Sequence, residues 1–359
     1  MATRILIDGS MGEGGGQVLR SALALSMALG KAFCISEIRG KRPKPGLKRQ
    51  HLTCVRGAQA LCNARVEGDA INSMSLDFTP AAVQTGDYQF QIGTGGSITM
   101  VLQALVPPLL FADKPSSLLV SGGTHVPHAP PFEFLRDTLF PHLELLGPKL
   151  TAQMNKIGYM EIGGGSVRVD IIPTSRPGSL QLYEAGAFAG AEASIYGHNL
   201  PEGIIERELG ALLDSQYKAL GLGSENIACK TDPQAPDSPT GAGNTVLVTV
   251  RRGKLATVCG ECGWRGRTAE KVAHQAARRA LSLIKSGIPV EAHLADQLLV
   301  PLALAGGGSF VTERLSSHSQ TCLAVIAQFM ELESKIESSP TRGVRLSLKT
   351  QPKRAGVKI

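Results

Sequence analysis

The sequence predicts an α+β fold in which three repeated split β-α-β units, each a four-stranded sheet with two helices, surround a helical centre and carry a smaller inserted α/β domain. One pattern recurs along the chain: a short apolar strand, a Gly-rich turn, an apolar helix, a second strand, a second helix and two closing strands. A stretch between the second and third copies does not follow this pattern. We therefore expect a three-repeat domain over 1–183 and 287–359, and an inserted domain over 184–286.

The first copy begins with an apolar strand, residues 5–9, that enters the Gly-rich turn GEGGG. Apolar periodicity predicts the rest of this copy in order: a helix over 17–29, a strand over 32–38, a helix over 47–63 and closing strands over 64–68 and 73–78.

The second copy repeats this order. Its expected elements are a strand over 88–93, a helix over 98–112, a strand over 116–123, a helix over 132–147 and closing strands over 151–158 and 166–173.

The third copy is expected to begin with an apolar helix over 293–306. A strand over 309–314, a helix over 320–332 and a final strand over 344–349 follow it.

The inserted stretch has its own alternation of elements. It predicts a strand over 189–197, a helix over 201–221, a hairpin over 244–252 and 255–261, and an amphipathic helix over 268–287. The Pro-rich segment 232–243 is expected to be a mobile loop.

Composition limits the class of protein. Hydrophobic residues make up 43% and charged residues 19%, and no apolar run approaches the roughly 18 to 20 residues that span a bilayer. The first residues predict a strand and not a secretion signal, so a cytoplasmic protein without a membrane partner is expected. The seven cysteines are an odd number in apolar context, which favours reduced thiols over a disulfide framework.

The charge indicates an anionic partner. The formal net charge is +7, and six cations lie within the eleven residues 39–49. Such clustering suggests a nucleotide or nucleic acid, although mild basicity alone serves solubility. Cys259 and Cys262 form one C-x-x-C, which favours a structural role because the second pair of a zinc site is missing.

The turn GEGGGQ at 12–17 has neither the Lys-Ser/Thr of a Walker A loop nor dinucleotide-binding spacing. A tight turn would be its simplest explanation. However, a carboxylate at Glu13, beside backbone amides at a helix start, is suited to hold a divalent cation with phosphate oxygens. Arg20 on the same helix is placed to reach those phosphates.

The segment 38–53 concentrates cations around two prolines. Pro43 and Pro45 forbid a simple amphipathic helix. Arg39 and Arg42 on such a stiff loop are suited to bidentate phosphate recognition, and a solvated loop is the alternative.

Two later segments carry polar residues at helix starts. Asp296 and Gln297 begin the helix of HLADQ at 293–297, where Asp296 could simply cap the helix. His318 lies just before another predicted helix, and a lone histidine there is either structural or catalytic.

Six ordered segments, which together span nearly the whole chain, closely resemble the RNA 3′-terminal phosphate cyclases. They are GEGGGQVLRSAL, SEIRGKRPKPGLKRQHL, GTGGSITMVLQ, SGGTHVPHAPP, HLADQLLVPLALAG and SSHSQT. The resemblance implies three repeats like the C-terminal domain of a bacterial translation initiation factor, shared with enolpyruvyl transferases, plus an inserted domain.

The resemblance also implies site residues. The histidine that becomes adenylated matches His318, and the metal-binding acid matches Glu13. The phosphate-contacting residues match Arg20, Arg39 and Arg42, with Gln50 beside them. The nucleotide pocket matches Gln103, Pro130, Pro131, His293, Leu294, Ala295, Asp296 and Gln297. The chain departs from the family pattern at Cys322, where Asn is expected.

The implied activity is the ATP-dependent conversion of an RNA 3′-terminal phosphate to a 2′,3′-cyclic phosphate, through histidine-AMP and RNA-adenylate intermediates, with Mg²⁺ or Mn²⁺. A non-catalytic, cyclase-like ribosome-assembly protein and an enolpyruvyl transferase are the rival hypotheses, and the presence of His318 argues against both. Whether two copies form a homodimer is left open. The insert carries none of the six segments, so we expect its removal to spare self-adenylation more than RNA processing.

Overall fold

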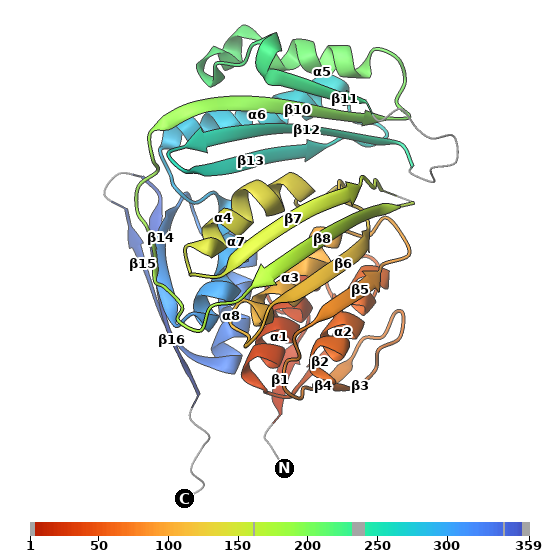
Figure 1. The fold of residues 1–359 in the computed structure, drawn as a ribbon, viewed down its shortest axis with the longest axis vertical. Coiled ribbons are helices and arrows are strands. Elements are labelled where there is room, and N and C mark those ends of the chain that lie inside the picture. The colour runs from red at the N-terminus through yellow and green to blue at the C-terminus, as the bar shows by residue number, and fades with distance from the viewer. Residues whose placement is uncertain (1–3, 161, 232–240, 340–341, 354–359) are drawn as a thin grey trace, which may run out of the picture.

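The computed structural model of the protein describes residues 4–160, 162–231, 241–339 and 342–353. These residues form four four-stranded sheets and the helices that cover them, which confirms the predicted α+β class (Figure 1). Most of the expected mobile loop, residues 232–240, lies outside the described residues.

The first copy forms one sheet in the order β1-β2-β4-β3, with β1 and β2 parallel and the other pairs antiparallel. Its elements are β1 (Ile5–Asp8), α1 (Gly16–Leu29), β2 (Phe33–Ser36), α2 (Arg49–Cys62), β3 (Arg65–Glu67) and β4 (Leu76–Thr79).

The second copy has the same strand order, β5-β6-β8-β7. Its elements are β5 (Asp87–Gln91), α3 (Ile98–Leu109), β6 (Ser116–Gly122), a π-helical segment (Phe134–Leu139), α4 (Phe140–Glu144), β7 (Lys149–Lys156) and β8 (Gly165–Ile172). The predicted second helix is therefore irregular. Pro141 at the start of α4 has no N–H to donate, so the regular hydrogen-bond ladder is interrupted there.

The third copy also follows this order, read as β9-β14-β16-β15. Its elements are β9 (Leu180–Leu182), α7 (Ala292–Leu304), β14 (Gly307–Thr312), α8 (Ser317–Phe329), β15 (Met330–Ser338) and β16 (Val344–Pro352).

Two expectations for this copy were wrong. The helix predicted to reach residue 332 ends at Phe329, and the chain turns directly into β15 at Met330. The copy also begins before the insert, because β9 pairs in parallel with β14. A three-residue strand has too few residues to show an alternating pattern, and Met and Glu at the start of β15 favour helix as much as strand.

The inserted stretch forms its own sheet, in the order β11-β10-β12-β13 (Figure 1, top). Its elements are β10 (Phe188–His198), α5 (Ile204–Leu212), a 3₁₀ turn (Ser215–Leu220), β11 (Ile227–Thr231), β12 (Gly243–Arg252), β13 (Leu255–Cys262) and α6 (Ala269–Ser286). A separate hydrophobic cluster joins this sheet to α5 and α6. The predicted helix over 201–221 is thus split, and β11 was not predicted.

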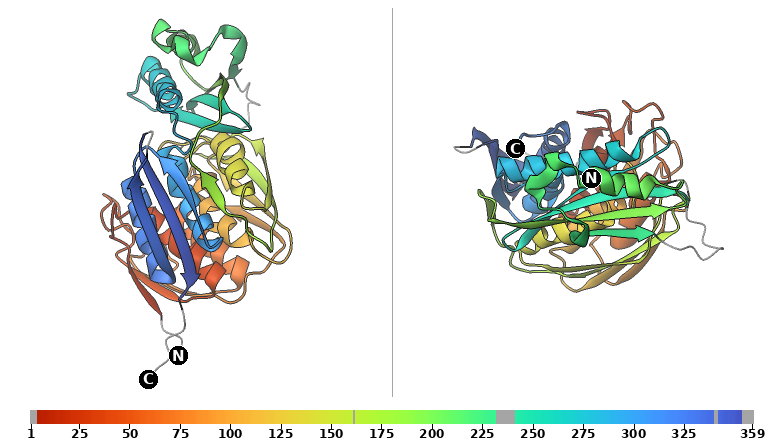
Figure 2. Two further views of the ribbon diagram at one scale, coloured as in Figure 1. Left: turned by 90° about the vertical axis from the view of Figure 1, so that its left-hand side faces the viewer. Right: turned by 90° about the horizontal axis from the view of Figure 1, so that it is seen from above.

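The helices of the three copies share one interior. α1, α3, α7 and α8 lie between the sheets, and the third-copy sheet covers them on one side (Figure 2). α1 buries eleven of its fourteen residues, because it contacts helices from all three copies. No helix in the described part of the chain combines the length and apolar character needed to cross a bilayer.

Candidate active site

The Gly-rich turn leads into α1 and leaves the first backbone N–H groups of this helix without a side-chain cap. Gly12 and Gly14 have φ angles of 56° and 58°, in the left-handed region that favours glycine. A Cβ atom on Gly15 would lie 2.7 Å from the Arg42 guanidinium and 2.7 Å from the Glu13 carboxylate. Gly15 is the N-cap and supplies no side-chain acceptor, so the N–H groups of the first turn remain available to a ligand.

His318 lies in the first turn of α8 and faces the start of α1. Its Nδ1 is 2.6 Å from Gln17 Oε1 and 3.0 Å from Glu13 Oε1. Both partners are acceptors, so Nδ1 carries the proton and the Nε2 lone pair of the neutral ring is left for another group.

The Glu13 carboxylate is shared between His318 and Arg42. Its Oε2 lies 3.3 Å from Arg42 Nη2. Burial raises the pKa of Glu13, but the hydrogen bond and charge of His318, with Arg42 and Arg20, outweigh burial and hold it below its usual value. In turn, the hydrogen bond to Glu13 raises the pKa of His318.

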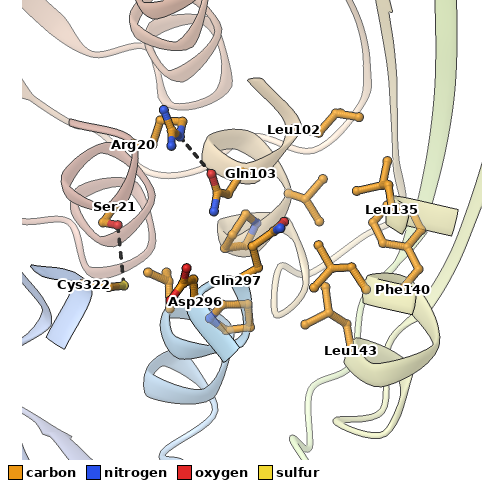
Figure 3. A pocket seen from close by; sticks show the side chains of 15 residues that line it. Arg20, Ser21, Leu102, Gln103, Leu135, Phe140, Leu143, Asp296, Gln297 and Cys322 are labelled. Atoms are coloured by element: carbon orange, nitrogen blue, oxygen red, sulfur yellow. Dashed lines mark hydrogen bonds between the residues drawn. The ribbon is translucent and has the colours of Figure 1, made fainter. Parts of the chain in front are cut away.

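Arg20 is a buried cation with unused donors. It is 7% exposed, and among the described residues its hydrogen bond is from Nε to Gln103 Oε1, at 2.9 Å (Figure 3). Its Nη groups face Gly16 and the cavity described below. A buried guanidinium without a bonded carboxylate is costly unless an anion binds to it, so Arg20 indicates an anion site.

Asp296 anchors the start of α8. Its Oδ1 accepts hydrogen bonds from Ser316 Oγ at 2.6 Å and Ser319 Oγ at 2.5 Å. Ser316 is also the N-cap of α8 and accepts from the Ser319 N–H at 2.9 Å. Burial raises the pKa of Asp296, and the serine hydroxyls oppose that effect. Asp296 on α7 therefore holds the residues on either side of His318 in place.

A cavity of about 370 Å³ opens in front of His318. This volume lies in the range of small-molecule sites. Eight of the expected site residues line it: Arg20, Gln103, Pro130, Pro131, His293, Asp296, Gln297 and His318. Next to it, a void of about 20 Å³ between α1, α3, α7 and the π-helical segment with α4 is lined largely by apolar side chains (Figure 3).

The insert forms one wall of the same cavity. Six of its residues line the cavity: Gly260, Glu261, Cys262, Trp264, Arg267 and Arg279. The six recurrent segments did not indicate this wall, because the insert carries none of them and the tertiary packing of β13 against the second copy brings these residues to the cavity.

The remaining expected residues lie elsewhere. Leu294 and Ala295 are fully buried in the core and not in the cavity. Gln50 Oε1 accepts the Ser97 N–H at 2.7 Å, just before α3. Arg39 Nη1 donates to two carbonyls of its own loop, and so holds that loop in place.

Cys259 and Cys262 occupy opposite faces of β13, because they are three residues apart in a strand. Cys259 belongs to the insert core, whereas Cys262 lines the cavity. Burial raises the pKa of Cys259 to about 12 and that of Cys262 to about 11. This geometry favours the structural role over a shared metal or a disulfide. Cys322 is also buried, with Sγ 3.7 Å from Ser21 Oγ (Figure 3).

A divalent cation at Glu13 would depend on ligands from the substrate. Among the described residues, no three His, Cys, Asp or Glu side chains gather closely enough to hold a metal ion. A ligand set of one carboxylate, phosphate oxygens and water nevertheless matches the way Mg²⁺ is bound beside nucleotides. The residues present therefore fit a metal that arrives with a phosphate ligand.

Comparison with known proteins shows the family of the chain. The sequence model of one family, described as RNA 3′-terminal phosphate cyclase, matches residues 11–336. The chain belongs to the RNA 3′-terminal phosphate cyclase family. A protein of that name from Koribacter versatilis is 41% identical over 98% of this chain and 97% of its own length. One from Ectopseudomonas mendocina is 41% identical over 96% and 98%, and one from Pseudomonas fluorescens is 42% identical over 93% and 94%.

Membership of this family makes the chain an enzyme. It also confirms the resemblance drawn from the six segments. Gln17, which fixes the tautomer of His318, was not singled out from the sequence. It lies in the GEGGGQ segment, but nothing local shows that its amide meets a residue 301 positions later.

Proposed function

We propose that the protein uses ATP to convert an RNA 3′-terminal phosphate into a 2′,3′-cyclic phosphate, with His318 as the adenylated nucleophile. The observation that carries this proposal is the environment of His318. Gln17 and Glu13 hold its Nδ1, and His318 lines a cavity that is also lined by the buried Arg20.

In the first step, Nε2 of neutral His318 attacks the ATP α-phosphorus, and the bond to the bridging oxygen breaks to release pyrophosphate. His318 needs no proton transfer before this attack. Its ring proton is already on Nδ1, and Nε2 has a free lone pair. The imidazolium character that develops on bonding is stabilised by Glu13, whose carboxylate lies 3.0 Å from Nδ1. Arg20 is placed to neutralise charge on the phosphoryl oxygens.

In the second step, an oxygen of the RNA 3′-phosphate attacks the AMP phosphorus and frees His318. In the third step, the neighbouring 2′-hydroxyl oxygen attacks the 3′-phosphorus, loses its proton and expels AMP. The hydroxyl is held on the same ribose, so proximity contributes much of the required acceleration.

We further propose that Glu13 contributes to binding a Mg²⁺ or Mn²⁺ ion together with phosphate oxygens. A cation there would neutralise phosphate charge. Arg42, which forms an ion pair with Glu13, would then be free to contact a phosphate.

Covalent labelling tests the assignment of the nucleophile. In His318→Asn, the amide nitrogen takes the position of Nδ1 and retains a donor toward Gln17 and Glu13, while the Nε2 nucleophile is lost. After incubation with ATP labelled at the α-phosphate and denaturation, we expect labelled protein for wild type and at least a hundredfold less for this variant, by the order of magnitude that loss of a covalent nucleophile causes.

Gln320→Ala is the matched control, because Gln320 is exposed on the same helix. Equal labelling of His318→Asn and wild type would show that another residue is adenylated. Wild-type protein that retains no AMP would contradict the proposed mechanism as a whole.

A further inference from the structure

His51, the third residue of α2, is a buried histidine that the mechanism above does not use. It is 8% exposed. Its Nδ1 accepts the backbone N–H of Lys48 at 3.3 Å, as part of the cap of α2. Burial, followed by the charges of Arg20, Arg39 and Lys48, lowers the pKa of His51 to about 3. The ring is therefore neutral near pH 7, and because Nδ1 is an acceptor, its proton is on Nε2.

The Nε2–H group points at the start of α1. Nε2 is the atom nearest to the position that a Cβ on Gly16 would take, and Arg20 Nη1 lies 2.9 Å from the same position. No described residue accepts a hydrogen bond from Nε2. Although the residue is more than nine-tenths buried, its Nε2 atom remains accessible, so this donor can serve a ligand from outside the chain.

Three other sets of donors surround this position. Gly16 is the first residue of α1, whose N-terminal amides have no side-chain cap. Arg20 and Arg42 flank the turn before it, and Arg42 lies beside Gly15. Glu13, a carboxylate close by, is already shared between Arg42 and His318. Positive charge and the helix terminus thus exceed the negative charge at this position.

We propose that the start of α1 is a binding site for the RNA 3′-terminal phosphate, and that His51 Nε2–H donates a hydrogen bond to one of its oxygens. The proposal rests on the proposed function, which requires such an end to bind. A neutral donor suits this position because a further cation among Arg20, Arg39 and Lys48 would be repelled. His51 does not line the nucleotide cavity, whereas Arg20 faces both places. The two phosphorus centres would therefore lie on either side of Arg20.

Two substitutions of His51 distinguish its Nε2–H donor from its part in capping α2. In His51→Asn, Oδ1 replaces Nδ1 as the acceptor of the Lys48 N–H, and the Nε2–H donor is lost. In His51→Gln, the longer side chain returns an N–H group close to the position of Nε2. His142→Asn controls for the loss of a buried imidazole, since His142 is 1% exposed and lies in α4, outside the site.

The measurement is the affinity of the protein, without ATP, for two short RNA oligonucleotides that differ only in a 3′-phosphate or a 3′-hydroxyl end. We expect wild type to prefer the phosphate end. His51→Asn should reduce that preference roughly ten- to a hundredfold, the effect of one charge-assisted hydrogen bond. His51→Gln should restore part of it, and His142→Asn should keep it.

An unchanged preference in His51→Asn would overturn the proposal. So would a loss of ATP affinity in this variant as large as its loss of preference, because the donor would then serve the triphosphate. If His51→Asn does not fold, Gly16→Ala provides the test, since its methyl group would press against Nε2 and should abolish the preference. Failure of the proposed function would be seen separately, as wild-type protein that takes no label from ATP.

Discussion

At the scale of single residues, His318 and His51 are each held by a hydrogen bond at Nδ1, and each keeps Nε2 available to a ligand. Gln17 and Glu13 accept from His318 Nδ1, which leaves a lone pair on Nε2. Lys48 donates to His51 Nδ1, which leaves a proton on Nε2. Identical side chains are therefore expected to act as nucleophile and as hydrogen-bond donor, because their neighbours differ in donor and acceptor character.

Glu208, in α5 of the insert, is a buried carboxyl group whose charge is poorly compensated. Asn244 Nδ2 donates to its Oε1 at 2.6 Å, while Oε2 is buried without a hydrogen-bond partner among the described residues. Burial raises the pKa of Glu208 from its ordinary value of 4.5 to about 7.

We predict that Glu208→Gln stabilises the protein at high pH. As pH rises from 4.5 to 7, the unfolded state ionises this group before the folded state does, so the wild type loses stability over that window. Gln removes the loss, which amounts to at most about 3 kcal/mol. The thermal midpoint of the variant should exceed that of wild type at pH 8 and approach it at pH 4.5. Glu206→Gln, exposed on the same helix, is the control, and an equal gain from it would contradict the explanation.

At the scale of elements, the start of α8 decides where His318 lies. Ser316 is bonded both to the Ser319 N–H and to Asp296 on α7, so one hydroxyl caps the helix and connects it to its neighbour. Ser317, one residue later, is exposed, and its hydroxyl has no partner among the described residues.

We predict that Ser316→Ala lowers the free energy of unfolding by about 1 to 2 kcal/mol, because it removes an N-cap and a donor to a buried carboxylate. Ser317→Ala should change it by less than about 0.5 kcal/mol. Denaturant unfolding of both variants checks this difference. Equal effects would show that the Asp296 contact does not stabilise the helix start.

The elements that could be predicted from sequence are those with local signals. The apolar helix at 17–29 and the strand at 32–38 have clear periodicity and appear as α1 and β2. β9 could not be predicted, since its three residues are strand only because β14 lies beside them. The same holds for the site: Glu13 and His318 stand in recognisable segments, whereas Trp264 reaches the cavity only through the packing of the insert.

At the scale of the whole molecule, the insert is joined to the second copy by buried polar contacts. Tyr196 on β10 donates to Glu133 Oε1 at 2.6 Å, and Glu133 Oε2 lies 2.8 Å from His125 Nε2. Nearby, the Val258 N–H on β13 donates to Thr138 Oγ1 at 2.9 Å. β13 carries cavity-lining residues at its far end, so these contacts hold the insert wall against the cavity in front of His318.

The contact between Tyr196 and Glu133 gives the last prediction. Burial raises the pKa of Glu133, but the charge of His125 and the hydrogen bonds of His125 and Tyr196 outweigh it and lower the pKa to about 2. Tyr196→Phe therefore leaves an ionised, buried oxygen without its donor, which should cost about 1 to 3 kcal/mol of unfolding free energy. Because this contact orients the insert wall, ATP affinity should fall together with stability.

Tyr217→Phe is the control, since Tyr217 donates to the His274 carbonyl within the insert. It should lower stability without the same loss of ATP affinity, as measured by unfolding and by nucleotide titration at one pH. If both variants lose ATP affinity equally, the general stability of the insert, and not the contact with Glu133, maintains the cavity wall.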